Sequence, residues 1–359
     1  MKGKFKGYLA IAIALFTVSC NTSEEEKKSL LPNSTGELAE IVVLSDKATL
    51  DSAFKLEIES VFSKALEGQP PPGEAVFKVV FADETFFGGY YEKHHNLFIL
   101  LTSQNAARLK KVLPKKWVDG LLNTKQQKPG IVGVKQEDIF AKNQNVFVIL
   151  ANDKTTLSNK LKAKKDDLLN IGVQHENASG KRKLLGTAKA SADKFYQKCL
   201  TDRGFGVRLP QTYRVAKDVA DFVWIRKQIT KEEKEMSILL FEAPYTSTQD
   251  LTTDSLLAIR NRYAKKYIPG EIDGSYMKYS SALPPVRTDQ NFKEKYGVEI
   301  RGWWDVQGDF MGGPSYIRAV VDEANGRIVF AEGFLFYPNE KKAKSMRELE
   351  ILVNTLSIK

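Results

Sequence analysis

The sequence predicts an α+β protein made of two α/β-sandwich-like halves, each with a mostly antiparallel sheet flanked by helices. Short β-branched runs alternate with stretches of helical apolar periodicity in both halves. Hairpins outnumber crossover connections, and Asn325-Gly326 is the strongest hairpin signal. A chain of 359 residues, 42% hydrophobic and 27% charged, is long enough to bury a large core. We therefore favour α+β layers over a doubly wound parallel sheet.

The predicted first half comprises residues 36–175. A β-branched run at 41–44 predicts a strand, and the residues after it place one apolar face on a helix that the prolines of 69–73 end. The stretch 172–186, rich in Ser, Asn, Gly and Lys, predicts a break between the halves. Further strands and one lysine-rich helix are expected, in order, at 76–81, 97–101, 146–150 and 154–169.

The predicted second half comprises residues 187–359. A hairpin of two strands is expected at 222–228 and 236–241, and a helix at 251–267 ends before Pro269-Gly270. Three further strands are expected at 298–306, 316–322 and 327–337. A terminal helix covers the sheet with one apolar face, formed by Met346, Leu349, Leu352, Val353 and Leu356.

The beginning of the chain predicts export and anchoring. Lysines precede an apolar run at 8–18 that is too short for a permanent transmembrane helix, as in a signal peptide. The run ends at Ser19-Cys20, which resembles the lipobox of bacterial lipoproteins, in which the cysteine is acylated and becomes the first mature residue. We interpret 1–19 as the signal peptide, Cys20 as the palmitate-bearing anchor and 20–35 as a flexible tether. The alternative is an ordinary cleaved signal with an incidental cysteine.

Anchoring at Cys20 places the protein in the cell envelope, attached to a membrane by lipid. The acidic residues Glu24, Glu25 and Glu26 resemble the export tags of some Gram-negative lipoproteins. A plain solvated linker explains them equally well. We expect an outer-membrane location with the folded part facing the periplasm or the surface.

The scarcity of reactive residues argues against several enzyme classes. Two cysteines exclude a disulfide scaffold, and we expect Cys199 to be buried and inert. With three histidines, no metal or cofactor is expected: His94 and His95 should point to opposite faces of a strand, and His175 has no partner spacing. The S-x-x-K match at 191–194 lacks the S-D-N and K-T-G companions of serine-lysine enzymes.

Positive charge is concentrated in residues 105–200, which hold 20 Lys and Arg against 8 Asp and Glu. Such a surplus attracts anionic head groups of phospholipid or lipopolysaccharide near the tether. Lysines that merely solvate helices are the simpler interpretation, because no aromatic spacing accompanies them. No nucleic-acid partner is expected.

The candidate ligand or partner surface lies around the strand predicted at 298–306. Alternation places Val298, Ile300, Trp304 and Val306 in the core and the intervening side chains on the other face. A tryptophan among charged neighbours suits recognition, and the glycine-rich connection that follows presents a Phe-Met pair, although that pair also fits a loop folded onto the protein's own core. Tyr276, near Pro269-Gly270, is grouped with them by hypothesis. The predicted surface comprises Arg301, Trp303, Asp305, Asp309, Phe310, Met311 and Tyr276.

Four blocks resemble the domain-of-unknown-function family 4837, which consists of Gram-negative bacterial lipoproteins without an established activity. They are 30–49 (LLPNSTGELAEIVVLSDKAT), 266–277 (KYIPGEIDGSYM), 301–317 (RGWWDVQGDFMGGPSYI) and 332–338 (EGFLFYP). The resemblance runs from about Leu30 to the end of the chain. It implies the envelope location and supplies no mechanism.

Together these features predict an uncharacterised envelope lipoprotein that is a non-catalytic binding or interaction module for an envelope protein or small ligand. The alternative is a hydrolase that acts on an envelope glycan or other polymer, with Asp305 and Asp309 as its acid-base pair. A deep cleft with converging carboxylates favours the hydrolase. An aromatic patch favours the binding module.

Overall fold

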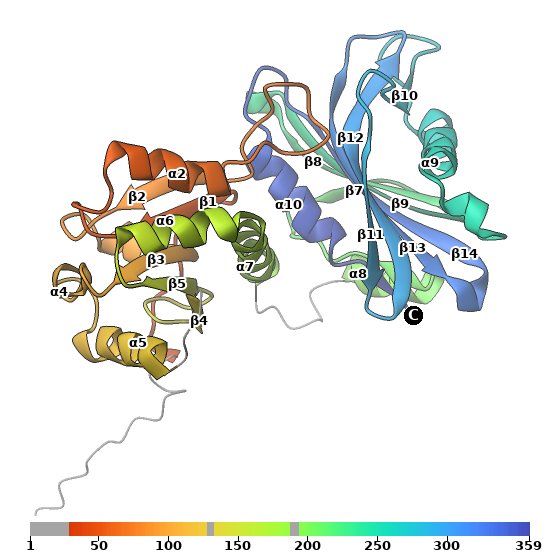
Figure 1. The fold of residues 1–359 in the computed structure, drawn as a ribbon. Coiled ribbons are helices and arrows are strands. Elements are labelled where there is room, and N and C mark those ends of the chain that lie inside the picture. Colours follow the sequence, from red (N-terminus) through yellow and green to blue (C-terminus); the bar gives the residue numbers. More distant parts are fainter. Residues whose placement is uncertain (1–28, 128–132, 187–193) are drawn as a thin grey trace, which may run out of the picture.

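The computed structural model describes residues 29–127, 133–186 and 194–359 and confirms the α+β class (Figure 1). The predicted signal peptide, Cys20, most of the tether and residues 191–193 of the S-x-x-K match lie outside the described residues. Within those residues, no helix combines the length and apolar character needed to cross a membrane.

The first half is a five-stranded sheet with helices on both faces. Strands β1, β2, β3 and β5 are parallel, and only β4 is antiparallel, in the order β2-β1-β3-β5-β4. The expectation of a mostly antiparallel sheet is therefore wrong for this half, because helical crossovers connect its central strands. Its elements are β1 (Glu40–Leu44), α2 (Ser52–Phe62), β2 (Lys78–Ala82), α3 (Gly89–Glu92), β3 (Asn96–Thr102), α4 (Ala106–Leu109), α5 (Lys115–Gln127), β4 (Gly133–Glu137), β5 (Asn145–Ala151), α6 (Lys154–Ala163) and α7 (Lys165–Leu185).

Two apolar cores lie on the two faces of this sheet. Helices α2, α6 and α7 cover one face, and α4 and α5 cover the other. Every residue of β1, β3 and β5 is buried, as parallel strands covered on both faces require.

Helix α7 runs through the predicted break at 172–186. The predicted helix 154–169 is instead two helices, and the second continues to Leu185. Its glycines serve packing: a Cβ at Gly172 would lie 3.2 Å from the Phe77 ring, and one at Gly180 would lie 2.5 Å from Cδ1 of Ile351. Glycine here allows two elements to approach closely and does not end the helix.

The second half is an eight-stranded antiparallel sheet, as predicted. Its order is β10-β12-β13-β14-β9-β8-β7, and β11 also pairs with β12. Gly326 has a left-handed conformation at the β13–β14 turn, which confirms the Asn325-Gly326 hairpin. The elements are α8 (Lys194–Asp202), β6 (Phe205–Gly206), β7 (Arg214–Val219), β8 (Phe222–Ile229), η2 (Thr230–Glu232), β9 (Lys234–Pro244), η3 (Thr248–Leu251), α9 (Thr253–Tyr267), β10 (Tyr276–Tyr279), β11 (Val286–Phe292), β12 (Lys295–Gln307), β13 (Gly312–Asp322), η4 (Glu323–Asn325), β14 (Arg327–Phe336), α10 (Ala343–Val353) and β15 (Ser357–Ile358).

Helix α9 covers one face of the large sheet and α10 covers the other. The predicted core side of β12 is confirmed, since Val298, Ile300, Trp304 and Val306 are all buried in the core beneath α9. Cys199 is buried as expected, and burial raises the pKa of its thiol to about 11.

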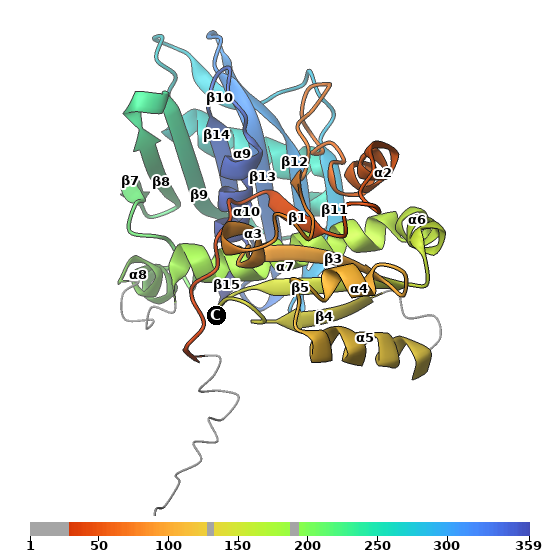
Figure 2. The same ribbon diagram turned by 90° about the vertical axis from the view of Figure 1, so that its left-hand side faces the viewer.

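The two halves meet through α10. Figure 2 shows this helix beside the first half, and the carboxylate of Glu74 accepts hydrogen bonds from the backbone N–H groups of Lys342 (2.7 Å) and Ala343 (2.8 Å). Glu74 thus satisfies backbone N–H groups that have no partner within the helix where α10 begins. Lys344 also forms an ion pair with Glu37. Specific hydrogen bonds and an ion pair therefore join the two halves.

Candidate functional site

Strand pairing brings Tyr276 beside the strand that carries most of the predicted surface. Tyr276 of β10 lies opposite Gln307 of β12, and Lys278 lies opposite Asp305. The Nζ of Lys278 is 3.9 Å from Oδ1 of Asp305. Tyr276 and Gln307 are paired although 31 positions separate them in the sequence, so no local sequence pattern predicts that they are neighbours.

The loop between β12 and β13 is held by its own hydrogen bonds. The N–H of Val306 donates to the carbonyl of Met311 at 3.0 Å, and the N–H of Phe310 donates to Oδ1 of Asp309 at 2.6 Å. Gly308 has φ +90°, which side-chain-bearing residues rarely adopt. Met311 packs against the core, whereas Phe310 is fully exposed. One member of the Phe-Met pair has folded back, and the other has not.

A second closed loop lies beside the first. Its N–H···O bonds run from Gly270 to Ser275 (3.0 Å) and from Ser275 to Ile272 (2.9 Å). A Cβ at Gly308 would lie 3.6 Å from that of Ser275, so the two loops are neighbours. Ile272 is 55% exposed. Two large apolar side chains, Ile272 and Phe310, thus face solvent on adjacent ordered loops.

We call these loops the distal surface, formed by residues 271–273, Tyr276 and 308–310. It lies at the end of the molecule opposite the first described residues in both views (Figures 1 and 2). Its exposed rim carries Glu271 and Asp273, and Asp309 is partly exposed. The ammonium group of Lys265 lies 4.3 Å from the centre of the Tyr276 ring. The rim has more acidic than basic groups.

Arg301 does not lie with the distal loops. Arg301 is six residues from Gln307 along β12, which corresponds to about 20 Å of strand. Its guanidinium pairs with Glu350 of α10 and lies 4.5 Å from the centre of the Tyr316 ring. Trp303 lies opposite Pro314 and is half-buried. The structure thus separates Arg301, which lies at the inter-half interface, from the distal surface.

The two aspartates of the hydrolase alternative have separate roles. Asp305 lies near Lys278, and Asp309 accepts a hydrogen bond from its own loop. Three cavities occur elsewhere among the described residues, and neither aspartate lines any of these three. Asp305 and Asp309 thus have separate partners and share none of these three cavities.

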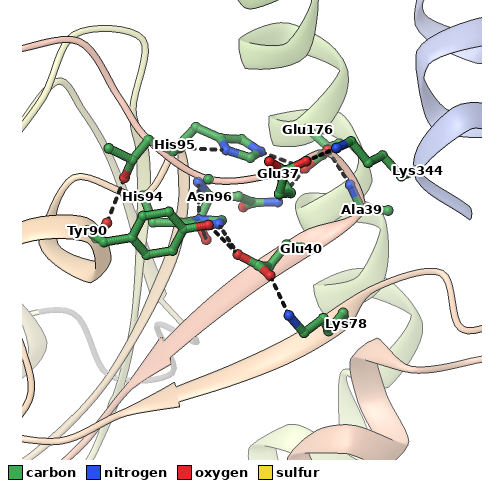
Figure 3. A network of polar contacts seen from close by, with 12 residues as sticks. Glu37, Ala39, Glu40, Lys78, Tyr90, His94, His95, Asn96, Glu176 and Lys344 are labelled. Atoms are coloured by element: carbon green, nitrogen blue, oxygen red, sulfur yellow. Dashed lines mark hydrogen bonds and ion pairs between the residues drawn. The ribbon is translucent and has the colours of Figure 1, made fainter. Parts of the chain in front are cut away.

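His94 and His95 belong to a buried polar network in the first half (Figure 3). The expectation that His94 and His95 point to opposite faces of a strand is wrong, because both precede β3 and their rings stack at 4.6 Å. Nε2 of His94 is 3.3 Å from Glu40, and Nε2 of His95 is 3.0 Å from Glu176. His175, also buried, lies one residue before Glu176 on α7.

Within this network the negative charge of Glu40 is stabilised by its neighbours. His94, Lys78 and Tyr90 hold the pKa of Glu40 at about 2 against the opposing effect of burial. Burial lowers the pKa of His94. The described residues contain no group of three or more His, Cys, Asp or Glu side chains arranged to hold a metal ion. We interpret the network as a structural tie between the strand ends and α7.

Sequence reasoning missed a polar cluster at the opposite, carboxyl edge of the same sheet. Parallel sheets of this kind bind ligands at that edge, where the connections diverge. Here Asn105 donates to the carbonyl of Leu100 (3.0 Å) and to Ser45 (3.2 Å), and Arg108 donates to buried Asp46 (2.6 Å). The signal was present as polar residues directly after strands. These polar groups form hydrogen bonds with one another at this edge, so we do not interpret the cluster as a ligand site.

Family models match both halves of the chain. Residues 192–355 match a domain of unknown function (DUF4837), and residues 34–184 match another domain of unknown function (DUF8532). The predicted resemblance is therefore confirmed for the second half, which contains three of its four blocks. The first block lies mainly in the region of the other model.

Comparisons with individual proteins add little. No curated protein matches the chain. A point mutant of the protein Mog1 is 8% identical and has a TM-score of 0.28, with 43% of this chain and 90% of that chain covered. LpqN of Mycobacterium tuberculosis, described as involved in cell envelope biogenesis, is 11% identical with a TM-score of 0.26, with 43% and 82% covered. At these scores the similarities carry no argument.

Proposed function

We propose that the protein is a lipid-anchored envelope protein that binds a protein partner through the distal surface and catalyses no reaction. The observation that carries the proposal is the full exposure of Phe310 on a loop that its own hydrogen bonds hold in place. Because the loop backbone is already held, binding orders only the Phe310 side chain, which has two torsion angles, and buries a large apolar area.

The chemistry of the rim narrows the class of partner. Ile272 and Phe310 suit an apolar pocket, and Glu271, Asp273 and Asp309 suit basic side chains around that pocket. Opposite charges at the rim of an interface raise the association rate and reject partners of the wrong sign. We therefore propose a protein with an apolar pocket in a basic surface.

Crosslinking in intact membranes tests this interface. A photoreactive phenylalanine analogue replaces Phe310 in the full chain, and the same analogue at Phe86, 71% exposed in the first half, is the matched control. We expect a discrete crosslinked protein from position 310 that is absent at position 86. Identical products at both positions, or no product at 310, would overturn the proposed interface.

Anchoring is a separate part of the proposal and rests on the Ser19-Cys20 motif. Cys20→Ser removes the thiol that carries the acyl chains, and one cysteine's lipid is the whole anchor in this scheme. We expect the variant to lose incorporation of labelled palmitate and to leave the membrane fraction. Unchanged membrane association with no label in either protein would show that Cys20 is not the anchor.

A further inference from the structure

Two arginines share one glutamate in the space between the halves. Arg301 of β12 and Arg347 of α10 both form ion pairs with Glu350. The distance from Nη1 of Arg347 to Oε2 of Glu350 is 3.1 Å. Although burial acts to raise the pKa of Glu350, the two guanidinium charges hold it below its ordinary value. The carboxylate is therefore ionised and compensates only one of the two positive charges.

The nearest other carboxylates are already engaged. Glu299 accepts hydrogen bonds from Tyr316 (2.6 Å) and Arg318 (2.7 Å). Glu176 of α7 acts electrostatically on Arg347, but its oxygens accept from Ala39 and His95 in the network of Figure 3. Glu299 and Glu176 thus make their hydrogen bonds elsewhere, and of these three carboxylates Glu350 is the one that bonds to the arginine pair.

Arg347 also has an unused donor. Its side chain is only 4% exposed, yet its Nε has no hydrogen-bond partner among the residues that the structure describes. A buried N–H donor of a charged group is usually satisfied, and one without a partner marks a place where a polar group is expected. The ring of Phe77 lies 5.5 Å from the guanidinium carbon and offers no lone pair.

A cavity of about 190 Å³ lies beside this donor, and both halves line it. One water molecule needs roughly 10–15 Å³ of such volume, so the cavity is large enough for a small solute. Its polar lining includes both arginines, Glu350, Asn170, and the ion pair of Lys64 with Glu67 at 3.5 Å.

We propose that this cavity binds a small oxyanion, of the phosphate or carboxylate type, between the two halves. Guanidinium groups bind both kinds of oxyanion through paired N–H···O bonds. Arg347 supplies its free Nε, Arg301 supplies charge from the strand side, and Lys64 lies at the first-half wall. The site is independent of the distal surface and of the partner proposed for it.

Thermal unfolding of the full chain measures binding directly. Sodium phosphate and sodium succinate are titrated separately at constant ionic strength, with sodium chloride as the reference. A ligand that binds only the folded protein raises the melting temperature as its concentration passes its Kd. We expect a rise with phosphate or succinate that begins near the Kd and then grows with the logarithm of the concentration, and none with chloride. The better ligand identifies the oxyanion type, and no rise with either overturns the proposal.

Variants then separate a binding site from a purely structural tie. Glu350→Gln removes the competing carboxylate, so we expect at least threefold tighter binding even if the variant is less stable. Lys64→Gln should weaken binding about threefold, and Lys162→Gln, 67% exposed and away from the cavity, is the matched control. A structural tie predicts no change of affinity in any of them, and equal effects of Lys64→Gln and Lys162→Gln would also overturn the site.

Discussion

The ion pair of Arg260 and Glu332 predicts a large loss of stability when one partner is removed. Both side chains are 0% exposed, and the guanidinium donates to the two carboxylate oxygens at 2.8 Å each. Ser315 donates to the same carboxylate at 2.8 Å. The pair joins α9 to β14 across the core of the second half.

Arg260→Met keeps most of the side-chain volume but leaves the charge of Glu332 without its partner. Breaking a buried pair in this way costs about 3–5 kcal/mol of unfolding free energy. The double variant Arg260→Met with Glu332→Leu removes both charges. It leaves the Ser315 hydroxyl without its acceptor, which costs about 1–3 kcal/mol. We therefore expect the double variant to be more stable than the single one.

Urea unfolding followed by tryptophan fluorescence measures these differences, since Trp304 lies in the same core. A lower midpoint with an unchanged m-value reports a loss of stability. Arg262→Met, on the exposed side of α9, is the matched control. The reasoning fails if the unfolding free energy of Arg260→Met lies within about 1 kcal/mol of that of the parent. It also fails if the double variant is less stable than the single one.

Three further predictions test the interface, the polar network and the thiol. Because the pKa of Glu40 falls from 4.5 to about 2 in the folded protein, its contribution to stability is present above pH 4.5 and is lost as the pH falls through about 2. Glu40→Gln should therefore flatten the fall in unfolding free energy between those pH values; an unchanged slope contradicts this. Gly180→Val should cost about 1–3 kcal/mol by overpacking against Ile351, and adding Ile351→Ala should restore part of it, as urea unfolding will show. Cys199 should resist alkylation until the protein unfolds, and mass spectrometry that finds it modified in native protein would contradict its burial.

Local patterns predicted the second half better than the first. The alternation along β12 assigned Trp304 and Val306 to the core because the strand is antiparallel and has two different faces. The fully buried run of β3 carries no alternation, since helices cover both of its faces. The composition of 172–186, which includes Gly172 and Gly180, predicts a break, because sequence shows a glycine's propensity but not the neighbour that requires it.

The candidate sites show the same limit. Asp309 and Phe310 are adjacent in sequence, so a loop prediction brings them together. Arg301 and Glu350 are 49 positions apart, and only the docking of α10 on the sheet makes them partners. Arg301 was predicted as a ligand-binding residue from its place on a strand face. Its partner, and the cavity that both line, depend on contacts that no local pattern contains.

The interface between the halves bears on how a tethered protein presents its distal surface. Glu74 holds the beginning of α10, Lys344 pairs with Glu37, and Gly180 lets α7 approach Ile351. These contacts lie at the beginning of α10 and at Ile351 near its end, so the helix is attached to the first half at both ends. The chain enters through the first half, while the distal loops belong to the second (Figure 1). The inter-half contacts therefore bear on the direction in which Phe310 faces relative to the first described residues of the chain.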